Sequence, residues 1–327
     1  MSKGLVTLFG GSGFIGRYAA RKLVEAGWRV RVAVRRPHLA NDVRLAGVPG
    51  WVDIVQANVR NRESVARAVE DADAVVNLVG VLFEKGEQSF EGAQSRGALN
   101  VAELAGQAGV KRFVQMSAIG ADETSPSDYA RTKAEGEKAV RDHFPEAVIL
   151  RPSIVFGPED EFFNRFAGLT RFAPALPAIG GGRTRFQPVY AGDVAEAILA
   201  AVEREDAAGK TYELGGPRIY TMNEIYDFIF ETIDRPRGKL PLPYFIAKPM
   251  GLTFGAIWRA PFLPMHTVFG DPPITGDQVE LLKSDNVVAE DALTLADLGV
   301  TELESIEAIV PSYLWRFRAY GEFHQEA

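Results

Sequence analysis

The sequence contains no cysteine and only four histidines among its 327 residues. The absence of cysteine excludes disulfides, thiolate metal ligands and cysteine nucleophiles, and it fits a reducing compartment. The histidines, His38, His143, His266 and His324, lie far apart and show no paired spacing. Because zinc sites usually draw on closely spaced histidines or cysteines, we expect no metal site.

Long apolar runs and an excess of positive charge are also missing. No stretch of about 20 apolar residues occurs, so we expect no transmembrane helix. The first apolar strand begins at Leu5, which leaves no space for a leader peptide in the sequence as given, and we expect a cytoplasmic protein. Lysine and arginine total 36 against 43 aspartates and glutamates, a net charge of -7, so nucleic acid is not an expected partner.

The first half of the chain alternates short apolar runs with helical patterns. Such alternation is typical of stacked βαβ units around a parallel sheet. Strands are predicted at residues 5–9, 29–34, 51–58, 74–80, 112–118 and 147–152, and the clearest helices at 17–27, 63–73 and 97–109. The expected fold class is therefore α/β, a Rossmann-type doubly wound parallel sheet with a smaller C-terminal lobe.

The pattern changes after residue 157, where prolines and a triple glycine interrupt regular structure. A helical pattern resumes at residues 189–204, and a short strand follows at 211–216. We therefore expect residues 1–157 and 189–216 to form a dinucleotide-binding domain. Residues 158–188 and 217–327 are expected to form a smaller substrate-like or docking lobe.

Three glycines, Gly10, Gly13 and Gly16, follow the first strand and open the first helix. In this context the first glycine permits a tight turn, the second lets a pyrophosphate approach the backbone, and the third lets helix and strand pack closely. The positive end of the helix then faces the phosphates. This pattern predicts a dinucleotide site.

The end of the second predicted strand indicates which dinucleotide binds. NAD-binding proteins usually carry an acidic residue there, which holds the ribose 2′-hydroxyl. This sequence has Arg35 and Arg36 instead, and Arg17 follows the last glycine. Guanidinium groups suit a phosphate, so the expected cofactor is NADPH. Ordinary solvated arginines are the alternative interpretation.

Further cofactor contacts are expected from the loops that follow the other strands. Asn58 is a candidate for the adenine edge, and the end of the fourth strand is expected to line the middle of the cofactor. The remaining candidates are Ser12, Phe14, Ile15, Val59, Leu78, Val79, Gly80, Ser117, Tyr129, Lys133, Pro152 and Ile154.

Tyr129 and Lys133 lie four residues apart on a predicted helix, so both project from one face. A nearby ammonium lowers the pKa of a phenol, which allows the phenol to exchange a proton with a carbonyl or an alcohol. The pair therefore fits reductase chemistry. Two solvated helix residues at this spacing are the alternative.

The glycine motif, the pair Tyr129 and Lys133, and the stretch RPSIVFGP at residues 151–158 together resemble the extended and atypical short-chain dehydrogenase/reductase superfamily. That resemblance implies a serine or threonine just past the fifth strand, at the position of Ala118. Ser117 precedes that position and should point to the other face of the strand. Only 12 positions separate Ser117 from Tyr129, so the sequence leaves the catalytic roles of Ser117, Tyr129 and Lys133 open.

Longer stretches are similar to one branch of this superfamily. They are GGSGFIGRYAARKL, SAIGAD at 117–122, residues 129–166 and ITGDQVELLKSDNVV at 274–288. These stretches resemble the NAD(P)H-binding Rossmann accessory subunits of respiratory complex I, the NADH:ubiquinone oxidoreductase. The resemblance implies bound NADPH without turnover and a stabilising or assembly role on the hydrophilic arm near the quinone site.

The same resemblance implies other complex I subunits as partners. It also implies a peripheral location on the inner face of a bacterial plasma membrane, or on the matrix side in an organelle. Residues 244–265 are too interrupted to span a membrane, yet they are rich in apolar side chains: Phe245, Leu252, Phe254, Ile257, Trp258, Phe262 and Leu263. They could face a partner or a membrane surface, or they could cover the core of the smaller lobe.

Two other functions remain open from the sequence. One is an NADP-dependent reductase or nucleotide-sugar epimerase that uses Tyr129 and Lys133 on a small-molecule substrate. The stretch GGGRTRF at residues 180–186 keeps this alternative open, because Arg183 and Arg185 could hold a substrate diphosphate. The other is a regulator that binds NADP(H) and a protein partner.

Overall fold

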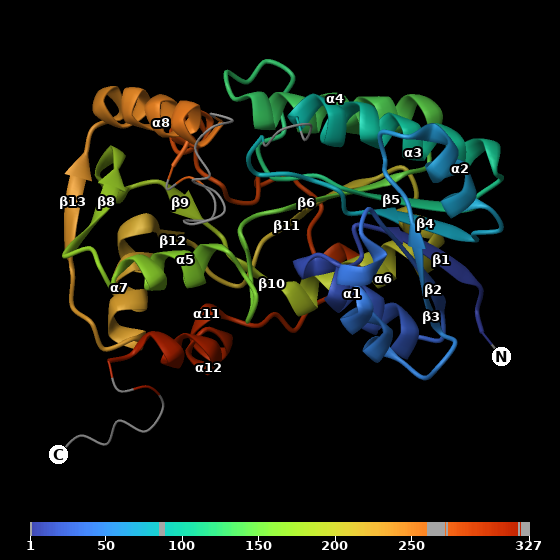
Figure 1. Cartoon of the computed structure of the whole chain (residues 1–327), viewed down its shortest axis with the longest axis horizontal. Coiled ribbons are helices and arrows are strands. Elements are labelled where there is room, and N and C mark those ends of the chain that lie inside the picture. The colour runs from blue at the N-terminus through green and yellow to red at the C-terminus, as the bar shows by residue number, and fades with distance from the viewer. Residues whose placement is uncertain (1, 85–88, 260–271, 273, 320, 322–327) are drawn as a thin grey trace. The chain divides into compact units, whose positions relative to one another are not determined.

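The structure is a computed structural model, and it describes residues 2–84, 89–259, 272, 274–319 and 321 (Figure 1). The chain divides into two compact units. The first comprises Met1–Pro152, Ala191–Leu214 and Ala289–Thr301, and the second comprises Ser153–Tyr190, Gly215–Val288 and Glu302–Ala327. Residues 289–301, which we expected in the smaller lobe, lie in the first unit. Their place is set by a parallel bridge from Leu293 to Tyr212 and by the amide of Ala289, which donates to Glu213.

A seven-stranded sheet in the order β11-β6-β5-β4-β1-β2-β3 forms the centre of the first unit. Every neighbouring pair in it is parallel. The strands are β1 (Leu5–Phe9), β2 (Arg29–Val34), β3 (Val52–Gln56), β4 (Ala74–Asn77), β5 (Arg112–Met116), β6 (Val148–Pro152) and β11 (Thr211–Leu214). The expected Rossmann-type parallel sheet is confirmed.

Helices cover both faces of this sheet. α2 (Arg62–Val69), α3 (Arg96–Gln107) and α4 (Asp128–His143) lie on one face, and α1 (Phe14–Glu25) and α6 (Ala191–Glu203) on the other (Figure 1). The apolar side chains between the first of these helical layers and the sheet form one buried cluster, which includes Phe9, Val75, Val101, Phe113 and Ile149. The two helical layers thus bury both faces of the sheet.

Several predicted element ends were wrong by a few residues, for local reasons. The first helix begins at Phe14 because Gly13 is its N-cap, and it ends before Gly27, which has a φ of +95°. The second helix stops at Val69, ahead of Asp71 with a φ of +57°. The fourth strand ends at Asn77, since the amide of Val79 turns back to the Asn77 side chain.

The close approach of α3 and α4 fixes where α4 lies. A π-helical turn at Glu91–Ser95 leads into α3. At Gly136 on α4, a Cβ atom would lie 2.4 Å from the carbonyl oxygen of Gln94, so only glycine fits there. The next residue on α4, Glu137, is 3% exposed, and its carboxylate accepts two hydrogen bonds from Arg151 on β6, at 2.8 and 2.7 Å. These contacts hold α4 against the end of β6.

The second unit is built from short elements. Its described strands form three pairs: β7 (Val155–Phe156) with β10 (Val189–Tyr190), β8 (Ala175–Ile179) with β13 (Gly238–Leu242), and β9 (Arg185–Phe186) with β12 (Tyr220–Thr221). Its helices are α5 (Phe162–Leu169), α7 (Met222–Thr232), α8 (Tyr244–Arg259), α10 (Gly276–Leu281), α11 (Ile306–Ile309) and α12 (Pro311–Leu314). Among the described residues, no helix is long and apolar enough to cross a bilayer.

A buried carboxylate organises the aromatic core of the second unit. Asp160 is 3% exposed and accepts hydrogen bonds from the amides of Phe163, at 2.7 Å, and Gly157, at 3.2 Å. The hydroxyl of Tyr313 on α12 donates to the same carboxylate. Burial raises the pKa of Asp160, and these hydrogen bonds oppose that shift. The carboxylate thus caps α5 and ties the C-terminal helices to it.

We predict that Tyr313→Phe lowers the free energy of unfolding by about 1 to 3 kcal/mol, because the buried Asp160 carboxylate loses a donor. Urea denaturation measures this loss. The control is Tyr220→Phe, which removes a hydroxyl bonded to Glu307, a carboxylate whose side chain is 45% exposed. The control should cost less, since water replaces the lost bond. Equal losses in the two variants would contradict the structural role of Asp160.

Candidate functional site

The glycine turn between β1 and α1 has the geometry of a phosphate seat. Gly10 adopts a φ of +76°, its amide donates to the carbonyl of Ala33 at 3.2 Å, and its own carbonyl accepts from the amide of Gly13 at 3.0 Å. The chain therefore reverses within four residues and enters α1 at Phe14. The amides of the first helical turn point out of the helix end, where they can bind an anion.

The third glycine has no room for a side chain. A Cβ atom on Gly16 would lie 2.5 Å from the carbonyl oxygen of Gly10 and 2.6 Å from the Cα of Gly11. On the exposed Gly13, a Cβ would meet only the Gly10 carbonyl oxygen, at 3.2 Å. Gly16 thus serves the packing of helix against turn, and Gly13 leaves the turn open on its outer side.

Arginines gather at the carboxyl end of β2. Arg35 and Arg36 are exposed, and within the described part of the chain neither forms an ion pair. Burial lowers the pKa of Arg35, and the charges of Arg36 and Arg60 lower it further. The sequence reasoning missed Arg60, which joins this group from the loop after β3. Arg17 differs from them, because its guanidinium donates to the carbonyl of Ser12 at 2.9 Å.

The loops after β3 and β4 are fixed by their own amide side chains. Asn58 accepts a hydrogen bond from the amide of Arg60 at 3.1 Å, and the carbonyl of Val59 accepts one from Asn100 at 2.8 Å. After β4, Asn77 donates to Gln115 at 2.9 Å and accepts from the amide of Val79 at 3.2 Å. Asn100 and Gln115 are supports that the sequence reasoning did not identify, since only the tertiary fold brings them to these loops.

Tyr129 and Lys133 lie one turn apart on α4, as the sequence predicts. The Nζ of Lys133 lies 5.8 Å from the centre of the Tyr129 ring and donates to the carbonyl of Met116 at 3.3 Å. A Cβ on Gly80 would lie 3.2 Å from this Nζ, so the ammonium faces the loop after β4. Burial lowers the pKa of Lys133 to about 8, and the charge of Glu137 opposes the shift.

Ser117 does not join this pair through any hydrogen bond that the described residues provide. The amide of Ser117 donates to Leu150 at 2.7 Å, and that of Ile119 donates to Pro152 at 3.0 Å, so β5 continues to pair with β6 past its end. The hydroxyl of Ser117 is buried, and it has no partner among the described residues. Pro152 ends β6 in the first unit, and Ile154 belongs to the second unit.

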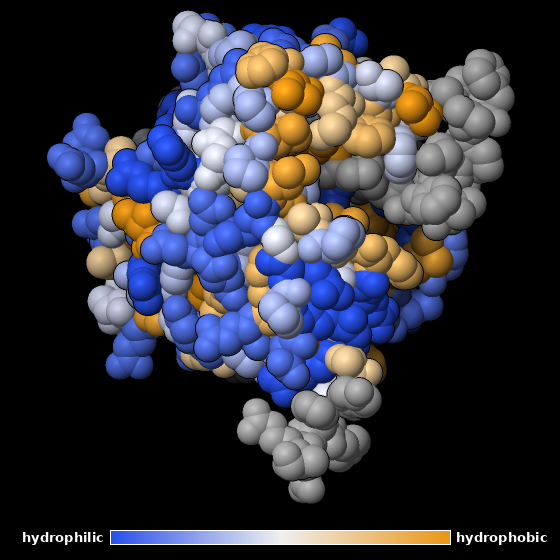
Figure 2. Space-filling model, turned by 90° about the vertical axis from the view of Figure 1, so that its left-hand side faces the viewer, coloured by the Kyte–Doolittle hydropathy of each residue, from blue (hydrophilic) through white to orange (hydrophobic). Residues whose placement is uncertain are grey.

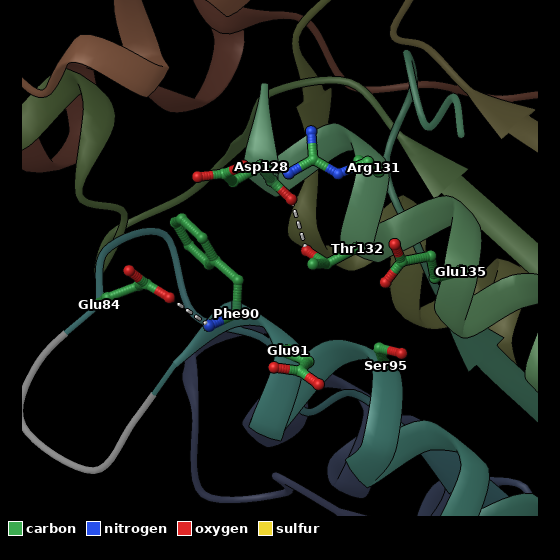
Figure 3. Close-up of a pocket in the computed structure, with 8 residues that line it drawn as sticks. All are labelled: Glu84, Phe90, Glu91, Ser95, Asp128, Arg131, Thr132 and Glu135. Atoms are coloured by element: carbon green, nitrogen blue, oxygen red, sulfur yellow. Dashed lines mark hydrogen bonds and ion pairs between the residues drawn. The ribbon is translucent and has the colours of Figure 1, made fainter. Parts of the chain in front are cut away.

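An acidic cavity of about 330 Å³ lies beside the start of α4 (Figure 3). Among the described residues, its lining includes four carboxylates, Glu84, Glu91, Asp128 and Glu135, and the cation Arg131. Because four carboxylates surround it, the cavity does not suit an anionic dinucleotide. No group of side chains within the described residues could hold a metal ion.

Comparison with known proteins gives a consistent picture. Residues 6–215 match the NAD dependent epimerase/dehydratase family. The chain is 36% identical over 322 residues to the mitochondrial protein NADH dehydrogenase (ubiquinone) 1 alpha subcomplex subunit 9 of Arabidopsis thaliana, which covers 97% of this chain and 79% of that protein. The protein of the same name from Mus musculus is 36% identical over 311 residues, with 93% and 79% covered.

Among solved structures, the NADPH-dependent quinone oxidoreductase of Escherichia coli has a TM-score of 0.68 at 18% identity, covering 94% of this chain and 99% of that one. At this identity the likeness supports the fold alone.

We predict that Gly16→Ala destabilises the protein by about 1 to 3 kcal/mol, because the added methyl group collides with the backbone of the glycine turn. Thermal or urea unfolding measures the effect. Gly255→Ala in α8 is the matched control, since no described atom lies within 4 Å of its added Cβ and alanine favours a helix. A Gly16→Ala protein as stable as the control variant would refute the packing argument.

The buried ammonium of Lys133 should make stability depend on pH. Its folded pKa of about 8 lies below the ordinary value of 10.5, so the folded state binds fewer protons than the unfolded state between these values. The free energy of unfolding of the unsubstituted protein minus that of Lys133→Met should therefore rise from pH 8 to pH 10.5, by up to about 3 kcal/mol. Urea unfolding of both proteins across this range measures the difference, which cancels the other titrating groups. A difference that stays flat would show that Lys133 is not desolvated.

Proposed function

We propose that this chain is an accessory subunit of respiratory complex I. The premise is that the chain belongs to the NAD dependent epimerase/dehydratase family. Within that family it belongs with the mitochondrial NADH dehydrogenase accessory subunits. The observation that carries the proposal is the 36% identity to such a subunit across 97% of the chain. Because the similarity to that subunit covers 97% of the chain, it extends through both structural units.

The family implies a nicotinamide dinucleotide, and we infer that this dinucleotide is NADPH. The residues present fit its phosphates: the glycine turn offers amides to the pyrophosphate, and Arg35 and Arg36 offer cations to a 2′-phosphate. No acidic residue stands at the end of β2, where a carboxylate would hold the 2′-hydroxyl of NAD and repel the phosphate.

The other loops would hold the rest of the nucleotide. Asn58 and Val59 would border the adenine, and Leu78 to Gly80 would border the middle of the cofactor. Lys133 has protons to donate beyond its bond to Met116, and it faces Gly80, so it would hold the nicotinamide ribose. NADPH carries a transferable hydride, although this proposal assigns the chain no step that uses it. This chain's residues bind and orient it.

The residues around the nicotinamide end favour holding the cofactor over turning it over. Ala118 stands where the superfamily normally places a serine or threonine, so no hydroxyl there can polarise a substrate oxygen. The Ser117 hydroxyl is buried and has no hydrogen-bond partner among the described residues, so no hydrogen bond joins it to Tyr129 or Lys133. Lys133 and Tyr129 therefore fit a role in binding the cofactor, because the set of side chains that would transfer a proton to a substrate is incomplete.

A nucleotide that binds only the folded state stabilises it. At a free concentration 100-fold above the dissociation constant, the gain is about 2.7 kcal/mol. A bound NADPH would therefore strengthen the first unit as part of a larger assembly. We infer a stabilising or assembly role on the hydrophilic arm near the quinone site.

The second unit offers a surface for that assembly. Apolar side chains gather over α8 (Figure 2), where Phe245 is 77% exposed and Leu252 is 59% exposed. Leu240 on the neighbouring strand β13 is 59% exposed as well. Exposed apolar groups of this size are unfavourable in water unless a partner covers them. We infer that this face meets other complex I subunits or the membrane surface at the inner side of a bacterial plasma membrane. Phe262 and Leu263 lie outside the described residues.

We expect the tagged protein, isolated from native membranes with mild detergent, to bring other complex I subunits with it and to release NADP(H) in equimolar amount on denaturation. Mass spectrometry identifies the subunits, and chromatography identifies the nucleotide. The matched control is Arg36→Glu, which should release much less NADP(H), because its carboxylate repels the 2′-phosphate.

Recovery of the protein alone would overturn the assembly role. The decisive contrary result is a soluble protein that reduces a carbonyl compound and loses this activity in Tyr129→Phe. That result would establish the reductase alternative.

A further inference from the structure

Arginines gather around an exposed phenylalanine where α5, α7 and the C-terminal helices of the second unit end. We call this group the arginine surface; it comprises Arg171, Phe172, Arg235, Arg237, Arg316 and Arg318. Phe172 lies two residues past the C-cap of α5 and is 90% exposed. In Figure 1, α12 and α8 lie on opposite sides of the second unit. The arginine surface is therefore separate from the apolar face over α8.

Phe317, the last residue of η7 (Trp315–Phe317), brings three of these arginines together. Its ring centre lies 5.5 Å from the guanidinium carbon of Arg171 and 5.2 Å from that of Arg316. Its backbone carbonyl accepts a hydrogen bond from the Nε of Arg235 at 2.8 Å. Side chains that are far apart in the sequence thus meet around one residue.

The other two arginines bind the ends of helices. The Nε of Arg237 donates to the carbonyl of Thr170, the C-cap of α5, at 3.0 Å. The Nε of Arg318 donates to the carbonyl of Thr232, the last residue of α7, at 2.9 Å. Helix ends leave such carbonyls without an intrahelical donor, and a cation is favourable there. These bonds hold both arginines beside the group around Phe317.

None of these arginines forms an ion pair with a carboxylate in the described part of the chain. Their partners there are backbone carbonyls, the ring of Phe317 and, for Arg316, the side-chain oxygen of Asn164. Glu231 and Asp234 lie on the same segment, but neither pairs with them. The chain as a whole has a net charge of -7, so this excess of positive charge is local. It is complementary to a negatively charged partner.

The way in which these arginines are held favours one kind of partner. Arg235 and Arg318 use only Nε in their bonds, so both terminal nitrogens of each have N–H groups to donate. A guanidinium with a fixed plane matches a carboxylate through two parallel hydrogen bonds, and it loses less entropy on binding. The diffuse potential of a lipid surface attracts cations without requiring such fixed planes.

The exposed aromatic side chain also favours a protein partner. Aromatic residues and arginine are the types enriched at the centre of protein–protein interfaces. Phe172 and Arg171 are adjacent, and both are exposed. A partner that covers Phe172 would therefore bring its own side chains up to the guanidinium of Arg171.

We infer that the arginine surface binds an acidic partner protein, a neighbouring complex I subunit that presents aspartates and glutamates around an apolar patch for Phe172. The inference rests on the proposed function and adds the surface that is used and the chemistry of the partner. The apolar face over α8 is then a second and chemically different contact.

Site-specific photo-crosslinking in native membranes tests the inference. The tagged full-length chain carries the photoreactive analogue p-benzoylphenylalanine in place of Phe172, and mass spectrometry identifies the adducts after irradiation. We expect an adduct with a complex I subunit, mapped to a segment rich in aspartate and glutamate. Adding Arg171→Glu should lower the adduct yield about tenfold or more, because like charges then face each other across the interface.

The matched control is Arg29→Glu, which reverses the charge of an exposed arginine in the first unit. Within the described residues, Arg29 forms no ion pair either. This variant should leave the adduct yield within about twofold, since Arg29 lies outside the arginine surface. Urea unfolding of both charge variants shows whether a lost adduct reflects lost folding, and Arg171→Lys, which keeps the charge, should restore most of the yield.

Several results would overturn the inference while the proposed function stands. Adducts with lipid alone would assign the surface to the membrane, and adducts with residues 322–327 of the same chain would assign it to that segment. No adduct, in a protein that still copurifies with complex I subunits, would mean that nothing covers Phe172. An undiminished adduct in Arg171→Glu would exclude the charge complementarity. A protein that brings no complex I subunit with it overturns both proposals.

Discussion

The absence of a side chain at position 16 is the constraint on which the nucleotide site depends. With glycine there, the first turn of α1 approaches the carbonyl of Gly10 closely enough that any Cβ would overlap it. This contact directs the N-terminal end of α1 toward the carboxyl edge of the sheet, where the loops after β2, β3 and β4 also end. Helix dipole, free amides and loop side chains therefore converge on one edge.

Positively charged side chains lie at two separate places along that edge of the sheet, which fits an elongated ligand such as a dinucleotide. Arginines gather by the loops after β2 and β3, and a buried ammonium, Lys133, lies by the loop after β4. Keeping Lys133 charged in the interior costs free energy, and Glu137 offsets part of this cost while binding Arg151. The carboxylates gather instead around the cavity at the start of α4. An anion is thus attracted to one part of the first unit and repelled from another.

Local sequence patterns predicted those strands whose ends are set by residues close to them in the sequence. The strands at residues 5–9 and 29–34 match their predicted bounds, because alternation and flanking glycines mark them. Arg60 escaped notice because only the pairing of β2 with β3 brings it to Arg35. Residues 289–301 were misplaced for a similar reason, since their bridge to Tyr212 joins positions about 80 residues apart. Contacts of long sequence separation leave no periodic signal.

A binding-only role also follows from how catalysis differs from affinity. Interactions that are equally strong before and during a reaction strengthen binding without accelerating the chemical step. The contacts that the loops after β2 and β3 would make with the adenosine end of the proposed cofactor are of this kind, because they would lie far from the nicotinamide. What would accelerate hydride transfer is a donor aimed at the substrate oxygen, and at position 118 the chain provides only a methyl group. The free energy of nucleotide binding therefore goes into the folded first unit, and a unit stabilised in this way suits a fixed place in a large assembly.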